Sequence, residues 1–248
     1  TADLPMLFER AATTFQMLTG FNRVMLYRFL DEDAGRVVAE ARSAGLQSFL
    51  HHHFPASDIP KQARALYVRN RTRSIPDVDY VPAPIRPEGF ETLDLSDVGL
   101  RSVSPIHVRY LKNMGVAASA SISIVKDGVL WGMIACHHYT PRRLSPDLRA
   151  AAAGLASALA RQIRAKEEAE LYRERLRLRA AEDSLLPRII GMGDLVPAIR
   201  RLMPEMMAMM GATGFAVVEQ GKVYRHGTCP HDLAILDIAG WAMIRGAG

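Results

Sequence analysis

The polar side chains best suited to chemistry lie in two short segments of the chain. In residues 54–60 one carboxylate, Asp58, stands between two prolines, which hold its backbone in a stiff conformation. Residues 101–107 offer a guanidinium, two hydroxyls and an imidazole. Groups of this kind, held at fixed points, bind polar ligands through hydrogen bonds and charge.

Serines recur at alternate positions of a predicted strand, at Ser119, Ser121 and Ser123. Alternate residues share one face of a strand, and a fully buried strand would carry Val or Ile there. Two interpretations are open: this side faces solvent, or a bound polar ligand supplies hydrogen-bond partners. For the serines taken alone, the solvent-facing interpretation is favoured.

The other reactive side chains favour structural roles. The consecutive histidines 51–53 point in different directions, so they rarely converge on one metal ion. Cys136 has no Cys-x-x-Cys partner, and we interpret it as a small buried residue of a strand. The sequence also lacks the phosphate-binding motifs and the hydrolase motif Gly-x-Ser-x-Gly. The common enzyme signatures are therefore missing.

Helices and antiparallel strands must position the polar groups. Apolar residues at helical spacing predict helices over residues 6–19, 58–72 and 104–114, with Asp58 capping the second. Strand-like runs separated by polar turns predict hairpins over 23–41, 120–136 and 215–225. Residues 76–99 hold four prolines and predict a long loop. This element order indicates an α+β fold, an antiparallel sheet flanked by helices.

A long helical pattern begins at Ser145 and continues to Leu186, where Pro187 is expected to end it. About forty residues of helix span roughly 60 Å. An apolar stripe of that length is a liability in a monomer, so we predict a parallel homodimer through this helix. A helix over residues 194–210 and a hairpin then open a second α+β unit, which the sequence predicts to be incomplete.

Composition and charge limit the function class. The chain has 248 residues, 49% hydrophobic and 23% charged, a balance typical of globular proteins. Subtracting 26 acidic from 31 basic residues gives +5, and no five-residue basic run marks a nucleic-acid site. No run of 18 apolar residues predicts a membrane helix. With only Cys136 and Cys229, a disulfide framework is excluded and a reducing, cytoplasmic setting is expected.

Three motifs together resemble the chromophore-binding GAF domain of phytochromes, the bilin-binding red/far-red photoreceptors. They are residues 54–60 (FPASDIP), 100–115 (LRSVSPIHVRYLKNMG) and 130–138 (LWGMIACHH). Their order makes the resemblance specific, and the bacterial, biliverdin-using branch is the best match. The resemblance implies a GAF domain over residues 1–145 and a connecting helix over 146–186. Residues 187–248 resemble the start of the PHY domain, a partial second GAF-like unit.

The resemblance also implies a role for each matching position. Asp58 and His107 match the pair that holds the pyrrole nitrogens, and His137 matches the donor to the ring D carbonyl. Arginines match the propionate anchors, since a guanidinium pairs with a carboxylate through two hydrogen bonds. The implied chromophore-binding residues are Tyr27, Phe54, Asp58, Ile59, Pro60, Tyr67, Arg73, Arg101, Ser104, His107, Tyr110, Met114, Ser119, Ser121 and His137.

Biliverdin is expected to bind this chain without a covalent bond. Plant and cyanobacterial phytochromes carry their thioether-forming Cys immediately before the His, and that position is Ile106 here. Bacteriophytochromes use a Cys near the N-terminus, ahead of a PAS domain, and this chain begins after that region. The Pro-Arg-x-Ser-Phe motif of the PHY tongue is also missing.

The leading hypothesis is a sensory module rather than an enzyme. In it, Z/E photoisomerisation of biliverdin signals to an output domain outside this chain, a kinase or another effector. One alternative is a GAF domain that binds another small molecule, such as a cyclic nucleotide. The other is a GAF-type redox enzyme that uses Cys136. Neither alternative needs the motif at residues 54–60 or the region before His107, so the photoreceptor is favoured.

Overall fold

The computed structural model describes residues 3–30, 34–90, 92–99 and 102–245. The chain divides into two compact units, Thr1–Glu167 and Glu168–Gly248. The first unit contains the three motifs of the sequence analysis, and the second begins within a long helix.

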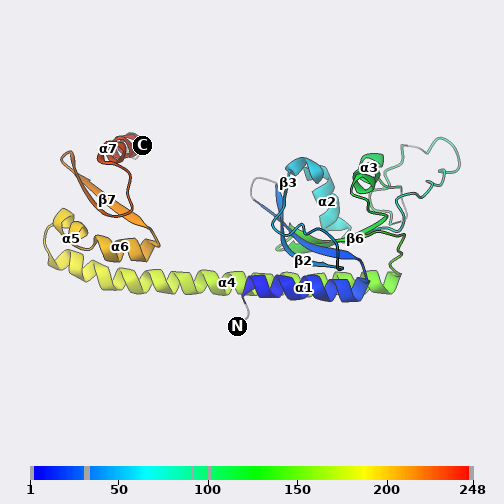
Figure 1. Ribbon diagram of the computed structural model, residues 1–248, viewed down its shortest axis with the longest axis horizontal. Helices are drawn as coiled ribbons and strands as arrows, with labels where there is room; N and C mark the ends of the chain where they lie inside the picture. Colours follow the sequence, from blue (N-terminus) through cyan, green and yellow to red (C-terminus); the bar gives the residue numbers. More distant parts are fainter. Residues whose placement is uncertain (1–2, 31–33, 91, 100–101, 246–248) are drawn as a thin grey trace. The chain divides into compact units, whose positions relative to one another are not determined.

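A six-stranded antiparallel sheet forms the centre of the first unit (Figure 1). The spatial order of the strands is β3-β2-β1-β6-β5-β4. The strands are β1 (Arg23–Phe29), β2 (Gly35–Arg42), β3 (His53–Phe54), β4 (Thr72–Ile75), β5 (Ala118–Lys126) and β6 (Val129–His138). The sheet confirms the predicted fold class and both hairpins predicted for this unit.

Helices cover the two faces of this sheet (Figure 1). Helix α1 (Leu4–Thr19) and the first part of α4 (Pro146–Gly191) pack on one face, where they form the main apolar core. Helices α2 (Lys61–Arg69) and α3 (Pro105–Asn113) lie on the other face. The predicted helices over 6–19 and 104–114 are confirmed, and Gly20 ends α1 in the left-handed conformation, with φ 66°.

The helix predicted over residues 58–72 is wrong at both ends, since α2 ends at Arg69 and Thr72 already belongs to β4. Residues Ala56–Asp58 form a 3₁₀ turn, and α2 begins only after Pro60. Pro60 takes the N-cap position with extended backbone angles, φ −65° and ψ 157°. Because proline fixes φ and disfavours helical angles in the residue before it, the chain turns between Asp58 and α2. Asp58 is therefore not the helix cap and presents its carboxylate from the turn.

Helix α4 does not end at Pro187, as the sequence predicted, but continues to Gly191. Proline removes one backbone hydrogen bond from a helix, and contacts on either side offset that loss here. Leu185 is buried, and the Arg188 guanidinium pairs with the Glu205 carboxylate at 2.8 Å. None of the helices in the described ranges is long and apolar enough to cross a membrane.

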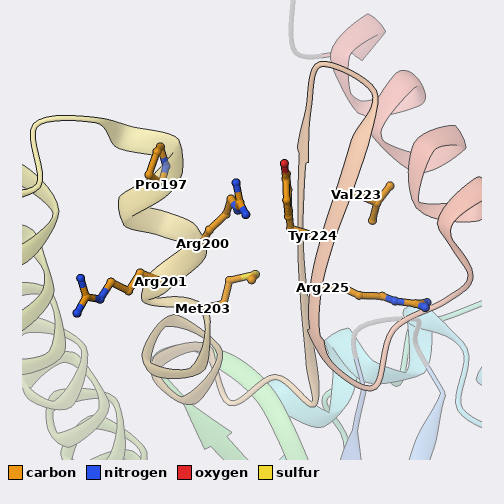
Figure 2. Close-up of a pocket in the computed structure, with 7 residues that line it drawn as sticks. All are labelled: Pro197, Arg200, Arg201, Met203, Val223, Tyr224 and Arg225. Carbon is orange, nitrogen blue, oxygen red and sulfur yellow. The ribbon is translucent and has the colours of Figure 1, made fainter.

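The second unit contains two short helices, a hairpin and a final helix. They are α5 (Leu195–Arg201), α6 (Met203–Met210), β7 (Gly214–Glu219), β8 (Lys222–Gly227) and α7 (Asp232–Arg245). The single helix predicted over 194–210 is interrupted at Leu202, because Pro204 provides no N–H donor. Figure 2 shows Arg200 of α5 beside Tyr224 of β8, with the guanidinium 3.3 Å from the ring centroid. This contact joins α5 to the predicted hairpin, which is confirmed.

Gly132 allows β1 and β6 to approach closely, and this generates a stability prediction. A Cβ at Gly132 would lie 2.4 Å from the backbone carbonyl oxygen of Tyr27, far inside contact distance. Since that oxygen belongs to a paired strand, Gly132→Ala should lower the free energy of unfolding by about 2 kcal/mol. Urea unfolding followed by Trp131 fluorescence measures the change.

The matched control is Gly154→Ala on α4, where a Cβ would meet open space. Alanine there should raise the free energy of unfolding by about 1 kcal/mol, because glycine is a weak helix former. Equal effects of the two substitutions would contradict the close approach at Gly132.

Candidate ligand-binding site

The register of the sheet brings the predicted polar residues onto the face covered by α2 and α3. Directly opposite residues of antiparallel strands share a face. His137 lies between Arg23 of β1 and Ser119 of β5. Ser121 lies opposite Arg73 of β4, in the next row of the same face. Four predicted residues from three strands therefore lie side by side.

The serines on this face are not a fully exposed strand side. Ser123 is buried, and its hydroxyl donates a hydrogen bond to the backbone carbonyl of Tyr67 at 2.7 Å. Ser119 and Ser121 are half-buried. The solvent-facing interpretation is therefore wrong for Ser123, which attaches the end of α2 to the sheet.

Aromatic and aliphatic residues form the apolar part of the same face. Tyr27, Phe54, Ile59 and Tyr67 share one apolar cluster. The Tyr27 ring meets the Phe54 ring at a centroid distance of 5.8 Å. It also lies over Gly35, where a Cβ would fall 1.8 Å from Tyr27 Cζ. Burial and the nearby Asp58 carboxylate raise the pKa of Tyr27 to about 12, so its hydroxyl stays protonated.

One side-chain hydrogen bond and one ring stack link the 3₁₀ turn to α3. The Tyr110 hydroxyl donates to the Asp58 carboxylate, and burial together with that carboxylate raises the pKa of Tyr110. His107, one turn earlier on α3, stacks on Tyr110 with ring centroids 6.2 Å apart and an interplanar angle of 12°. Burial and the positive charge of Arg73 lower the pKa of His107. The Tyr110 hydroxyl can therefore keep its proton in the hydrogen bond to Asp58, which connects α3 to the turn.

Arg73 brings a positive charge to the sheet face. Its guanidinium lies 4.5 Å from the centroid of the Tyr67 ring, which orients it by a cation–π contact. Arg73 is half-buried and shares its row with Ser121. A guanidinium and hydroxyls in one row suit a carboxylate ligand.

His137 carries the clearest unmet hydrogen-bonding capacity of this face. The side chain is buried, and its Nδ1 atom has no hydrogen-bond partner within the described residues. Burial, Arg23 and His107 lower the pKa of His137 to about 4, so the imidazole is neutral at pH 7. A buried polar nitrogen without a partner fits a site completed by a ligand.

Comparisons with known proteins identify the family. The GAF domain family matches residues 3–164. The chain belongs to the GAF domain family. A bacteriophytochrome of Xanthomonas campestris is 43% identical over 232 residues, which cover 92% of this chain and 36% of that protein. Cyanobacterial phytochrome B of Nostoc is 38% identical over 234 residues, covering 93% of this chain and 31% of that protein.

Solved structures of phytochromes share the fold of this GAF-containing chain. A bacteriophytochrome of R. palustris superimposes with a TM-score of 0.84 at 43% identity, covering 98% of this chain and 50% of that one. The photosensory core module of the Stigmatella aurantiaca phytochrome gives a TM-score of 0.80 at 41% identity, covering 96% and 48%. The chain spans about a third of the length of the curated relatives.

Some predicted residues of the GAF site are not joined to it by side-chain contacts. Arg101 lies outside the described residues. Ser104 and Pro60 are exposed and take the N-cap positions of α3 and α2. Met114 follows α3 and packs, together with Tyr110, against a small apolar cluster beneath that helix.

Sequence reasoning missed three charged residues of this GAF face. Arg64 donates from Nε to the Ile59 carbonyl at 2.9 Å and packs 4.5 Å over the Phe29 ring. Arg23 and Glu40 form a buried ion pair. The alternation of Arg23 with apolar residues on a strand was the available signal, because it places a charge on a buried face.

Cys136 lies on the opposite face of the GAF sheet, among the residues packed against α1 and α4. It is fully buried, and burial raises the pKa of its thiol to about 12. The thiolate, the nucleophilic form, is therefore strongly disfavoured. Histidines 51–53 are exposed, and no group of three metal-ligating side chains occurs within the described residues.

His137 makes the stability of the ligand-free GAF unit depend on pH. Its pKa is about 4 in the folded chain, well below the ordinary value of 6.5 for a histidine side chain. Below pH 6.5 the unfolded chain takes up a proton at His137 that the folded chain does not. The contribution of His137 to the free energy of unfolding is therefore fully present only above pH 6.5. It should fall by up to about 3 kcal/mol as the pH approaches 4.

The substitution His137→Gln should remove most of this dependence, measured by urea unfolding and Trp131 fluorescence. The exposed His53→Gln is the control and should keep the wild-type slope. An unchanged slope in His137→Gln would show that another group titrates.

Proposed function

We propose that this chain is the bilin-binding part of a light-sensing phytochrome and that biliverdin binds on the sheet face beneath α2 and α3. One observation carries the proposal. The face is apolar around Tyr27 and polar toward His137, whose buried Nδ1 atom has no partner within the described residues. The similarity to bacterial and cyanobacterial phytochromes supports it.

The residues of this face fit a linear tetrapyrrole. When bound, the bilin supplies light absorption and a Z/E change about one double bond. Tyr27, Phe54 and Tyr67 offer aromatic area for a flat conjugated molecule. Arg73, with the hydroxyls of its row, provides charge and donors for a propionate. In the next row of the same face, the neutral imidazole of His137 can donate a hydrogen bond to a ring carbonyl.

Asp58, Tyr110 and His107 hold the protons on the other side of the site. Tyr110 and Tyr27 keep their protons at neutral pH, since burial and Asp58 raise the pKa of each hydroxyl. Asp58, in a turn between Pro55 and Pro60, meets the ligand from a stiff backbone. We assign Asp58 and His107 to the pyrrole nitrogens.

Neither alternative function gains support from a specific contact. A redox enzyme that uses Cys136 needs an accessible thiolate, and this thiol is buried on the other side of the sheet. No catalytic activity is proposed for this chain. A kinase or other effector domain in the whole protein remains part of the proposal. The unpaired state of both cysteines is in line with the cytoplasmic location expected from the sequence.

We assign residues 1–145 to the GAF domain, 146–186 to a connecting helix and 187–248 to the start of a PHY domain. The family match to residue 164 and the first compact unit, which ends at Glu167, indicate that the first turns of α4 pack as part of the GAF domain. The hairpin and helices after Gly191 belong to the second unit, which begins at Glu168 within α4.

The first prediction from this function is that biliverdin binds this chain without a covalent bond. Cys136 faces away from the site, Cys229 belongs to the second unit, and Ile106 before His107 has no thiol. Adding biliverdin to the purified chain should sharpen and shift its absorption band. After denaturing electrophoresis with zinc, no fluorescent band should migrate with the protein.

A chain that leaves the biliverdin spectrum unchanged would overturn the proposed function. A zinc-fluorescent protein band would instead overturn the non-covalent attachment alone. In that case Cys136→Ser and Cys229→Ser would show which thiol is attached.

The second prediction concerns Asp58. Asp58→Leu removes the acceptor of the Tyr110 hydroxyl, so it should lower the photoconversion yield roughly tenfold while biliverdin still binds. Near-infrared emission should rise, because a competing decay route is lost. Asp79→Asn is the control, since this exposed carboxylate pairs with Lys112 on α3. Normal cycling of Asp58→Leu between two absorbing states would contradict this role.

The third prediction is a parallel dimer through α4. Its second half exposes large apolar side chains, among them Leu171 and Leu178, which are seven residues apart and so recur on one stripe. Sedimentation at tens of micromolar should give a dimer. Leu171→Glu with Leu178→Glu should give a monomer, and Arg175→Gln should not. A monomeric wild-type chain at that concentration would contradict the dimer.

A further inference from the structure

Arg23 is a fully buried arginine on the proposed ligand face. It lies in β1, directly opposite His137 of β6. A buried guanidinium is unfavourable unless it is paired and hydrogen-bonded. Arg23 pairs with Glu40, donates to the Gln47 backbone carbonyl at 2.6 Å, and lies 4.1 Å from the Phe49 ring centroid. Its charge is therefore held in one place by three neighbours.

Glu40 connects this charge to the loop of residues 43–52. Only 3% of its side chain is exposed. Its carboxylate accepts hydrogen bonds from the Ser48 hydroxyl at 2.6 Å and from the Phe49 N–H at 3.1 Å. Phe49 packs against the apolar cluster of Tyr27. Glu40 thus anchors one wall of the ligand face.

Among the described residues, Arg23, His107 and Ser119 face the His137 imidazole, and each is positively charged or neutral. Arg23 faces it from β1 and His107 from α3, and both disfavour the imidazolium. Ser119 of β5, on its other side, carries no charge. Glu40 is paired with Arg23, and its Oε2 atom also lies 3.5 Å from Arg42 Nε. These two guanidinium groups balance its negative charge.

We propose that the buried Arg23–Glu40 pair is a positioning unit for the ligand face. Glu40 holds the 43–52 loop and Phe49 against the sheet, while Arg23, directly opposite His137 in the strand register, places a positive charge beside its imidazole. Arg23 and Glu40 act through Phe49 and His137 and need not touch the ligand themselves. The identity of the ligand as biliverdin rests on the proposed function, but the charge relation between Arg23 and His137 does not.

The first test uses the ligand-free chain and NMR titration of the His137 imidazole, assigned with His137→Gln. The pKa of His137 should rise in Arg23→Gln, because a neighbouring positive charge is removed. Arg23→Lys keeps the charge and should restore the wild-type titration, although it loses the two-sided hydrogen bonding of the guanidinium. Arg28→Gln is the matched control, since Arg28 lies on the same strand and packs over Trp131, 5.2 Å from its ring.

A His137 pKa that is the same in Arg23→Gln and in the wild-type chain would overturn the electrostatic role. If Arg23→Gln does not fold, the double variant Arg23→Gln with Glu40→Gln provides the same measurement. It removes both charges and leaves no buried ion without a partner. The pKa of His137 should rise in this variant also, and a wild-type value would be equally decisive.

The second test measures biliverdin affinity and the absorption band in Glu40→Gln. This variant loosens the loop and leaves Arg23 without its counter-charge, so affinity should fall about tenfold. The double variant Arg23→Gln with Glu40→Gln should recover part of this lost affinity, because no unpaired buried charge remains. If Glu40 only anchored the loop, the double variant would recover none of it. Equal affinity and spectrum in wild type and Glu40→Gln would overturn the positioning unit. Failure of the wild-type chain to bind biliverdin would instead reject the proposed function and leave the NMR result standing.

Discussion

The pairing of β1, β6 and β5 is the constraint on which the rest of the first unit depends. Side chains alternate between faces along each strand, so this register decides which residues meet the core and which meet the proposed ligand site. Ile134 and Cys136 face α1 and α4, while Met133 and His137 face α2 and α3. The close approach of the strands at Gly132 maintains that register. A slip of one residue would exchange the core and the binding face.

The sequence predicted those parts of the fold that depend on local pattern. The hairpin at Asp127-Gly128, the helix after Ser104 and the burial of Cys136 in a strand follow from alternation and turn chemistry. The predictions failed where a local rule met a tertiary contact. Pro187 does not end α4, because Leu185 and Arg188 make contacts on both sides of it. Propensity is a weak guide where packing decides.

The site was predicted less completely than the fold, for a physical reason. The resemblance to phytochromes indicated Asp58, His107 and His137 singly, but the hydrogen bond between Asp58 and Tyr110 joins segments 52 positions apart. The alternation of residues along β1 places Arg23 on the buried side, yet no sequence rule pairs it there with Glu40 of the same hairpin. A long-range contact is determined by how helices and loops pack on the sheet, and a linear pattern does not contain that information.

A buried sheet face with this many polar groups would destabilise a protein that used it only as core. A buried nitrogen without a hydrogen-bond partner and a buried ion pair both stabilise the fold less than apolar side chains at the same positions would. The opposite face of the same sheet, lined by Val24, Leu26 and Ile122, shows what the core requires when no ligand is bound there. The polar character of the buried side chains on one face, compared with the apolar other face, therefore favours a role in binding over a role in stability. Stability is concentrated against α1 and α4, and the face beneath α2 and α3 keeps hydrogen-bonding capacity that a bound molecule can use.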